Sequence, residues 1–189
     1  MKIRAVPAAF VEFIHDEAIA VMWPGTEPVA AGVRDRKLLE SAVARPLQSA
    51  FGKPLYPTVL ERAAILFHGL IANHPFHNGN KRAAALTLQL FLAGNDYCLT
   101  LEQGELESLA RKTASYREDQ ISHSDMVSEI VHTVRGRTIR VAALKSFPEL
   151  RELRRGLALM KRAAMKVLEL AVLREEFFHP GGPLAPYVE

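Results

Sequence analysis

The stretch that decides the fold is TVLERAAILFHGLIANHPFHNGNKRAAALTLQLFLAGN, residues 58–95. Thr58 followed by Glu61 has the capping-box pattern, in which each side chain satisfies a free backbone N–H at the start of a helix. Apolar residues then recur at helical spacing until Pro75, which biases the residue before it away from helical geometry. A second run, 80–93, is apolar on nearly all sides, which is typical of a buried central helix. The stretch therefore predicts two packed helices joined by a short polar loop.

Helical patterns also flank this stretch on both sides. Residues 24–34 are expected to form a loop or short hairpin, and the proline-containing segment 46–57 is expected to be irregular. Strand signals are scarce, so the fold class is predicted to be mainly all-α. The other expected helices are 7–23, 35–44, 102–114 and 122–135. Gly94-Asn95 is the expected C-cap that closes the central helix.

Composition narrows the class of protein. The chain has 189 residues, 49% hydrophobic and 24% charged, which excludes a disordered or low-complexity chain. No segment has the roughly 18 uninterrupted apolar residues of a membrane span, and acidic residues interrupt the apolar N-terminal stretch, so we expect no membrane association and no secretory signal. The single cysteine, Cys98, fits a reducing compartment, and the cytoplasm is the predicted location. A net charge of only +3 does not favour nucleic acid as a partner.

The character of the sequence changes after residue 136. Residues 137–189 contain ten Lys or Arg and six Asp or Glu, and apolar residues recur there in steps of three and four from Leu150 to Ala171. This heptad seam predicts a long C-terminal helix near 148–178. Such a helix would pack back on its own domain, form a homo-oligomer arm or bind a partner. We therefore expect a domain at 1–136 and a C-terminal helical extension at 137–189.

The loop that enters the central helix carries the residues best suited to chemistry. A helix N-terminus attracts anions, and Gly79 lets a ligand approach the backbone closely. Asn80 offers amide donors, whereas Lys81 and Arg82 offer positive charge suited to phosphate oxygens. Two cations are unfavourable at the positive end of a helix dipole unless an anion binds there. His74 lies upstream, where an imidazole could accept a proton from an attacking hydroxyl.

Residues 74–82, HPFHNGNKR, resemble the signature of the Fic/Doc family, H-x-F-x-[D/E/N]-[G/A]-N-[G/K]-R. Upstream, the segments 32–35, 38–40 and 44–46 resemble the Doc branch, the death-on-curing toxins of bacterial toxin–antitoxin modules. The resemblance covers roughly residues 8–135. It implies a Fic/Doc-like helical bundle with a short β-hairpin flap.

The resemblance also implies a role for each matching position of the loop. His74 would be the general base that activates a Ser, Thr or Tyr hydroxyl of a target protein. Phe76 would anchor the loop in the core, and Gly79 with Asn80 would form an anion nest. Arg82 would pair with a nucleotide phosphate.

A second segment is implied to meet the target protein. In the family a flap near residues 29–35 receives a target segment as an added strand. The flap residues that carry the resemblance here are Gly32, Val33, Arg34 and Asp35.

Two positions bear on the group that is transferred. In adenylylating Fic proteins the position of Lys81 is usually Gly, and a second Arg stands where this chain has Ala85. Doc-like members share both departures and are understood to transfer the terminal phosphate to a translation factor. The resemblance therefore favours phosphoryl transfer from ATP or another nucleoside triphosphate, with AMP transfer as the alternative. Asn78 takes the family's usual acidic position, so it is expected to support Mg²⁺ more weakly than a carboxylate.

The resemblance implies partners as well. The target protein would be elongation factor Tu or another component of translation, and inhibition would come from an antitoxin in trans. The inhibitory pattern [S/T]-x-x-x-E-[G/N], found in some Fic proteins, does not occur in this sequence.

Three other interpretations of the sequence are a zinc site, a redox cysteine and a non-catalytic module. A zinc site built from His68, His74 and His77 lacks a matching carboxylate or thiolate spacing. Redox chemistry at Cys98 lacks a basic neighbour in the sequence. A non-catalytic Fic-like module that binds a nucleotide or a partner remains an alternative from a different class.

Overall fold

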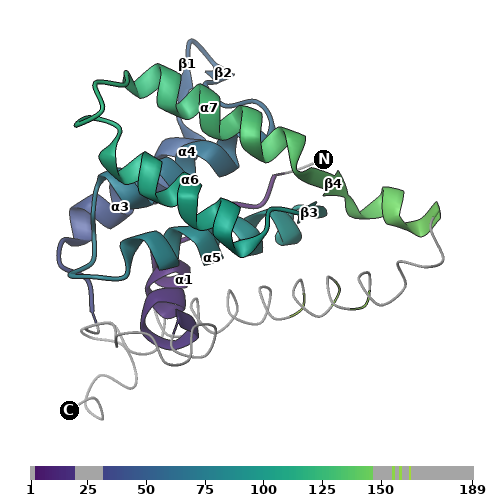
Figure 1. Cartoon of the computed structure of the whole chain (residues 1–189), viewed down its shortest axis with the longest axis horizontal. Helices are drawn as coiled ribbons and strands as arrows, with labels where there is room; N and C mark the ends of the chain where they lie inside the picture. The colour runs from purple at the N-terminus through teal and green to yellow at the C-terminus, as the bar shows by residue number, and fades with distance from the viewer. Residues whose placement is uncertain (1–2, 20–31, 147–154, 156–157, 159–161, 163–189) are drawn as a thin grey trace.

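The computed structural model describes residues 3–19 and 32–146, together with the isolated positions 155, 158 and 162. Within these residues the protein is mainly helical, as predicted, with six α-helices and two small two-stranded sheets (Figure 1). The predicted long helix at 148–178 lies outside the described residues, apart from those three positions. The α-helices are α1 (Ala8–Phe13), α3 (Arg36–Ala44), α4 (Val59–Ala72), α5 (Asn80–Gly94), α6 (Gln103–Ser115) and α7 (His123–Gly136).

The centre of the fold is the pair α4 and α5, which pack on each other. The capping box at the start of α4 is confirmed, since the Glu61 N–H donates to Thr58 Oγ1 and the Thr58 N–H donates to the Glu61 carboxylate. Helix α5 is buried on most sides, as its sequence predicts, because α4, α6 and the π-helix η1 (Ile14–Ala18) cover it. These two helices fix both ends of the loop between them, residues 73–79.

The N-terminal segment differs from a regular helix. Helix α1 continues into a π-helix, η1 (Ile14–Ala18), so residues 8–18 are helical but change their hydrogen-bond pattern midway. The predicted helix at 7–23 is confirmed up to this point. Its last part, like most of the expected loop or hairpin at 24–34, lies outside the described residues.

The predicted irregular segment 46–57 contains a small hairpin instead. A 3-10 turn, η2 (Arg45–Leu47), leads into strands β1 (Ser49–Ala50) and β2 (Lys53–Pro54), which pair antiparallel. The tip residues, Phe51 and Gly52, both have positive φ, at 50° and 73°. A two-residue turn with this backbone joins antiparallel strands, but Phe at its first position hides the usual Asn-Gly signal from the sequence.

A second strand pair was also missed by the sequence pattern. Strand β3 (Tyr97–Leu99) pairs antiparallel with β4 (Thr138–Arg140), which is followed by a 3-10 turn, η3 (Val141–Ser146). Three residues are too few to show the alternation that indicates a strand. The pairing connects the first residues of the predicted C-terminal extension to the segment after α5. The predicted domain boundary at residue 136 stays a prediction.

The expected C-cap of α5 needs a correction in its details. Gly94 is the last residue of the helix, Asn95 is the C-cap, and the left-handed residue is Asp96, with φ 65°. The buried Asn95 side chain accepts from the Arg4 N–H at 2.9 Å, so it also ties the N-terminal segment to this end of α5.

Across residues 3–19 and 32–146 we find no helix with the length and apolar character needed to cross a bilayer.

Candidate functional site

The loop between α4 and α5 leaves the helix at His74. This residue has φ 52°, a left-handed conformation, which ends α4 just after its C-cap residue, Asn73. His74 is exposed, whereas Phe76, two residues later, has no exposed surface. The sequence predicted the end of the helix, whereas a buried position for Phe76 was implied by the family resemblance. The loop therefore presents an imidazole to solvent from a backbone that a buried aromatic ring holds in place.

Asn80, the first residue of α5, closes the loop on itself. Its side-chain oxygen accepts from the Phe76 N–H at 2.9 Å, and its amide nitrogen donates to the Phe76 carbonyl at 2.9 Å. The same amide nitrogen lies 3.2 Å from Nδ1 and 3.3 Å from Nε2 of His74. Asn80 is buried, so its side chain braces the loop and the His74 ring, while its backbone N–H belongs to the first turn of the helix.

The flap residues pack against this loop. Val33 and Phe76 form an isolated antiparallel β-bridge, and the backbone N–H groups of Arg34 and Asp35 both donate to the Pro75 carbonyl. The Arg34 guanidinium also donates to the His74 carbonyl, at 3.0 Å from Nε. The structure thus brings the segment 32–35 and the segment 74–80 together, although they are about 40 residues apart in the chain.

Asp35 has a local structural role in this arrangement. Its carboxylate is the N-cap of α3 and accepts from the N–H groups of Lys37 and Leu38, at 2.9 and 3.2 Å. This cap fixes the direction in which the chain leaves the flap.

Comparison with known proteins identifies this part of the chain. Its residues 5–92 match the Fic/DOC family. This segment of the chain belongs to the Fic/DOC family. Over 60 residues the chain is 43% identical to Toxin Doc of Mycolicibacterium smegmatis (strain ATCC 700084 / mc(2)155), which covers 32% of this chain and 46% of that protein. The chain thus spans less than half the length of this curated relative. No solved structure shows significant similarity.

The Fic/DOC segment ends near the close of α5, whose first turn carries the two expected cations. Gly79 is the N-cap, with φ 71°, and the first turn contains no acidic residue, whereas Glu61, Glu105 and Asp125 lie in the first turns of α4, α6 and α7. Lys81 is exposed and Arg82 is partly buried. The α5 N-terminus is therefore the electropositive one among these four.

Lys81 also has an electrostatic effect on the neighbouring helix α6. The pKa of Glu107 is lowered mainly by its hydrogen bond and charge interaction with Arg111, with a smaller contribution from Lys81. The charge of Lys81 therefore acts on the Glu107 carboxylate of α6.

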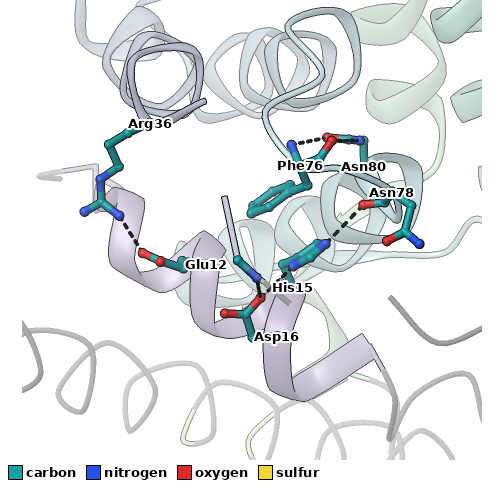
Figure 2. A network of polar contacts seen from close by, with 8 residues as sticks. Glu12, His15, Asp16, Arg36, Phe76, Asn78 and Asn80 are labelled. Carbon is teal, nitrogen blue, oxygen red and sulfur yellow. Dashed lines mark hydrogen bonds and ion pairs between the residues drawn. The ribbon is translucent and has the colours of Figure 1, made fainter. Parts of the chain in front are cut away.

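Two residues of the Fic/DOC segment, His15 and Asp16, connect to the loop and were not predicted as site residues. The imidazole of His15, in η1, is completely buried between Asp16 and the backbone of Asn78 (Figure 2). A signal was present in the sequence, because His15 stands four residues from each of two buried apolar residues, Val11 and Ile19. That spacing places His15 on the buried face of the helix.

Asn78 is the loop residue that was expected to support a metal ion. Asn78 is exposed and offers one neutral amide group. The described residues contain no group of three or more His, Cys, Asp or Glu side chains that could hold a metal ion.

The rival chemistries gain no support. His68, on α4, is buried against His123 and Tyr116, whereas His74 and His77 are exposed, so the three histidines of the zinc reading lie in different surroundings. Burial raises the pKa of the Cys98 thiol, which disfavours the reactive thiolate.

The buried His68 predicts acid sensitivity of the fold. Its two ring nitrogens have no hydrogen-bond partner among the described residues, and burial, then His123, Arg45 and Arg117, lower its pKa from 6.5 to about 4. The folded protein thus keeps this ring neutral where the unfolded chain protonates it. The resulting stability is fully present above pH 6.5 and is lost as the pH falls towards 4, with an expected size of roughly 2 kcal/mol.

Urea unfolding of the full chain at pH 7 and at pH 4.5 measures this effect. We expect the stability difference between the two pH values to shrink in His68→Leu. His132→Leu, at an exposed position of α7, is the matched control for the loss of one imidazole. An unchanged pH difference in His68→Leu would contradict the prediction.

Proposed function

We propose that this protein is a Doc-type transferase that moves the terminal phosphate of a nucleoside triphosphate to a hydroxyl of a target protein. One observation carries the proposal: a single short loop presents an exposed imidazole, His74, beside a helix N-terminus that has Gly79 as N-cap and Lys81 and Arg82 in its first turn. The match of residues 5–92 to the Fic/DOC family supports it.

His74 is the proposed general base. Its imidazole would accept the proton of a Ser, Thr or Tyr hydroxyl as the hydroxyl oxygen attacks the terminal phosphorus. The bond from this phosphorus to the bridging oxygen would break, leaving a nucleoside diphosphate and a phosphorylated side chain. The braces around His74 favour this role, because Asn80 and Arg34 hold its ring and its carbonyl while the ring stays exposed.

The start of α5 is the proposed phosphate cradle. Free N–H groups of the first turn and the helix dipole favour an anion at this position, and Gly79 keeps the approach open. Arg82 would pair with phosphate oxygens and Lys81 would add positive charge. Mg²⁺, where bound, would neutralise charge between phosphate groups, with the Asn78 amide as a weak protein ligand.

Two residues favour phosphate over AMP as the transferred group. Lys81 occupies a position where a small residue would leave more room for the phosphates, and Ala85, one turn further along α5, is buried and provides no second guanidinium. AMP transfer therefore remains the second candidate, with the same base and the same cradle.

The flap is the proposed docking place of the target. Val33 pairs with Phe76 along one edge of its backbone, and the other edge of the flap would receive a target segment as an added strand. Similarity to Toxin Doc supports a role as a toxin. Action on translation, elongation factor Tu as the target and an antitoxin as a partner in trans are parts of the proposal that come from the family resemblance of the loop. A homo-oligomer through the 148–178 region is a further proposal, and so is a cytoplasmic location.

Intact-mass analysis tests the reaction directly. Bacterial lysate proteins are incubated with the protein, ATP and Mg²⁺, and we expect one target to gain the mass of one phosphate. A gain of one AMP would instead assign the second candidate. Nucleotide binding without any mass gain, together with unchanged activity of His74→Ala, would favour a non-catalytic binding module.

A further inference from the structure

The pair formed by the buried His15 and the partly buried Asp16 connects the flap to the proposed phosphate-binding loop. His15 Nδ1 lies 2.7 Å from Asp16 Oδ1, and His15 Nε2 lies 3.1 Å from the carbonyl oxygen of Asn78. The same Asp16 oxygen accepts from the Gly32 N–H at 3.1 Å. A chain of three hydrogen bonds therefore runs from the end of the flap to the residue before Gly79.

The ring of His15 also holds the anchor of the loop. It stacks on Phe76 with 3.9 Å between the ring centroids and 3° between the planes. Figure 2 shows the imidazole between Asp16 and Asn78, beside the Phe76 ring. Both rings are fully buried, so the contact is part of the core rather than of the surface.

The two hydrogen bonds of the His15 ring lie inside this core, so they fix the orientation of the ring relative to the loop. A ring with an acceptor at each nitrogen makes both hydrogen bonds when each nitrogen carries a hydrogen. An apolar ring of similar shape would fill the same space but would leave the Asn78 carbonyl and the Asp16 carboxylate without this donor. The polar contacts thus orient the loop, whereas the stacking alone would only fill the core.

The local backbone places both residues for this task. They lie in the π-helix η1, an element that is rare and frequently found at functional sites. One turn earlier, Glu12 forms an ion pair with Arg36 of α3 at 2.6 Å, so the helix that carries His15 is also tied to the helix that follows the flap.

We infer that His15 and Asp16 are positioning residues, which hold the Asn78–Gly79 turn at the start of α5 in register with the flap. Neither residue touches the proposed reacting atoms. Through this pair, the position of the flap at Gly32 and the position of the loop carbonyl at Asn78 depend on each other. The consequence for nucleotide binding rests on the proposed function.

The variant His15→Phe separates orientation from packing, because Phe keeps a ring against Phe76 and loses both hydrogen bonds. Loss of one such hydrogen bond should raise local opening on the order of 5-fold. Because His15→Phe loses two such bonds, we expect hydrogen exchange of the amides at 77–82 and 32–35 to accelerate by at least this factor, with the melting temperature lowered by only a few degrees. ATP binding, measured by calorimetry with Mg²⁺, should weaken by a similar factor.

Changes at Asp16 provide a second test that leaves the buried ring intact. Asp16→Ala removes the acceptor that His15 and Gly32 share and should accelerate exchange in both segments. Asp16→Asn keeps an oxygen acceptor and should restore most of the protection. Glu17→Gln, at an exposed position of the same π-helix, is the matched control and should behave as wild type.

The outcomes separate this inference from the proposed function. Wild-type protection of the amides at 77–82 in both His15→Phe and Asp16→Ala would overturn the inference. Faster exchange with unchanged ATP affinity would overturn it as well, because the loop would not depend on this orientation for binding. A wild-type protein that binds no ATP would contradict the proposed function, and the exchange rates would then decide the inference by themselves.

Discussion

Replacement of His74 by Asn should lower the rate of phosphate transfer by about a hundredfold to ten-thousandfold, the usual contribution of a positioned general base. Asn tolerates the left-handed backbone that His74 adopts at φ 52°, so the loop should keep its shape. An amide does not take up a proton near neutral pH, so the variant loses the base and keeps a polar side chain. The measurement is the rate of mass gain of the target protein at saturating ATP.

ATP binding and a matched variant separate this role from others. Because His74 does not belong to the proposed phosphate cradle, His74→Asn should bind ATP with nearly wild-type affinity. His77→Ala removes the other exposed imidazole of the same loop and should leave transfer largely intact. Equal losses in His74→Asn and His77→Ala would show that neither imidazole is the specific base, and the assignment would then fall.

Signals that act over a few residues made the centre of the fold predictable. The capping box at Thr58 and Glu61 needs only four residues, and it occurs as predicted. The apolar residues on nearly all sides of α5 likewise indicate that other elements surround this helix, but they do not indicate which elements. The exit of the chain at His74 follows from Pro75 directly after it.

Contacts between distant segments could not be predicted in the same way. Asn80 was expected to face a ligand with its amide, yet that amide is engaged with both backbone groups of Phe76. Which partner an amide selects depends on the path of the loop, and this path in turn depends on the contacts of Phe76 with His15 and Val33. A sequence pattern does not contain such a closed set of mutual constraints.

The strands show the same limit for another reason. Strands β3 and β4 are separated by two helices, and each has only three residues. Their pairing is set by the packing of α6 and α7, which returns the chain beside Tyr97. Burial of His15 could have been predicted from its spacing to Val11 and Ile19, but its hydrogen bond to Asn78 could not.

Phe76→Ala should cost about 3–5 kcal/mol in the free energy of unfolding, the usual range for truncating a buried aromatic residue. Phe76 has no exposed surface, and its ring is stacked on His15 while its backbone pairs with Val33 and Asn80. The cavity would therefore open where three segments of the chain meet. Urea unfolding at pH 7 measures the loss, and Phe76→Leu, which leaves a smaller void, should lose less.

The stability loss by itself would only confirm a core residue, so a second buried phenylalanine serves as the comparison. Phe67, on α4, is equally buried but lies outside the loop. Phe67→Ala should lose a similar amount of stability, and its folded fraction should still bind ATP. Phe76→Ala should bind ATP at least about 10-fold more weakly per folded molecule, since the loop loses its anchor as well as its packing. Equal ATP affinity in the two variants would mean that Phe76 only fills the core and that the position of His74 and Gly79 is set by other contacts.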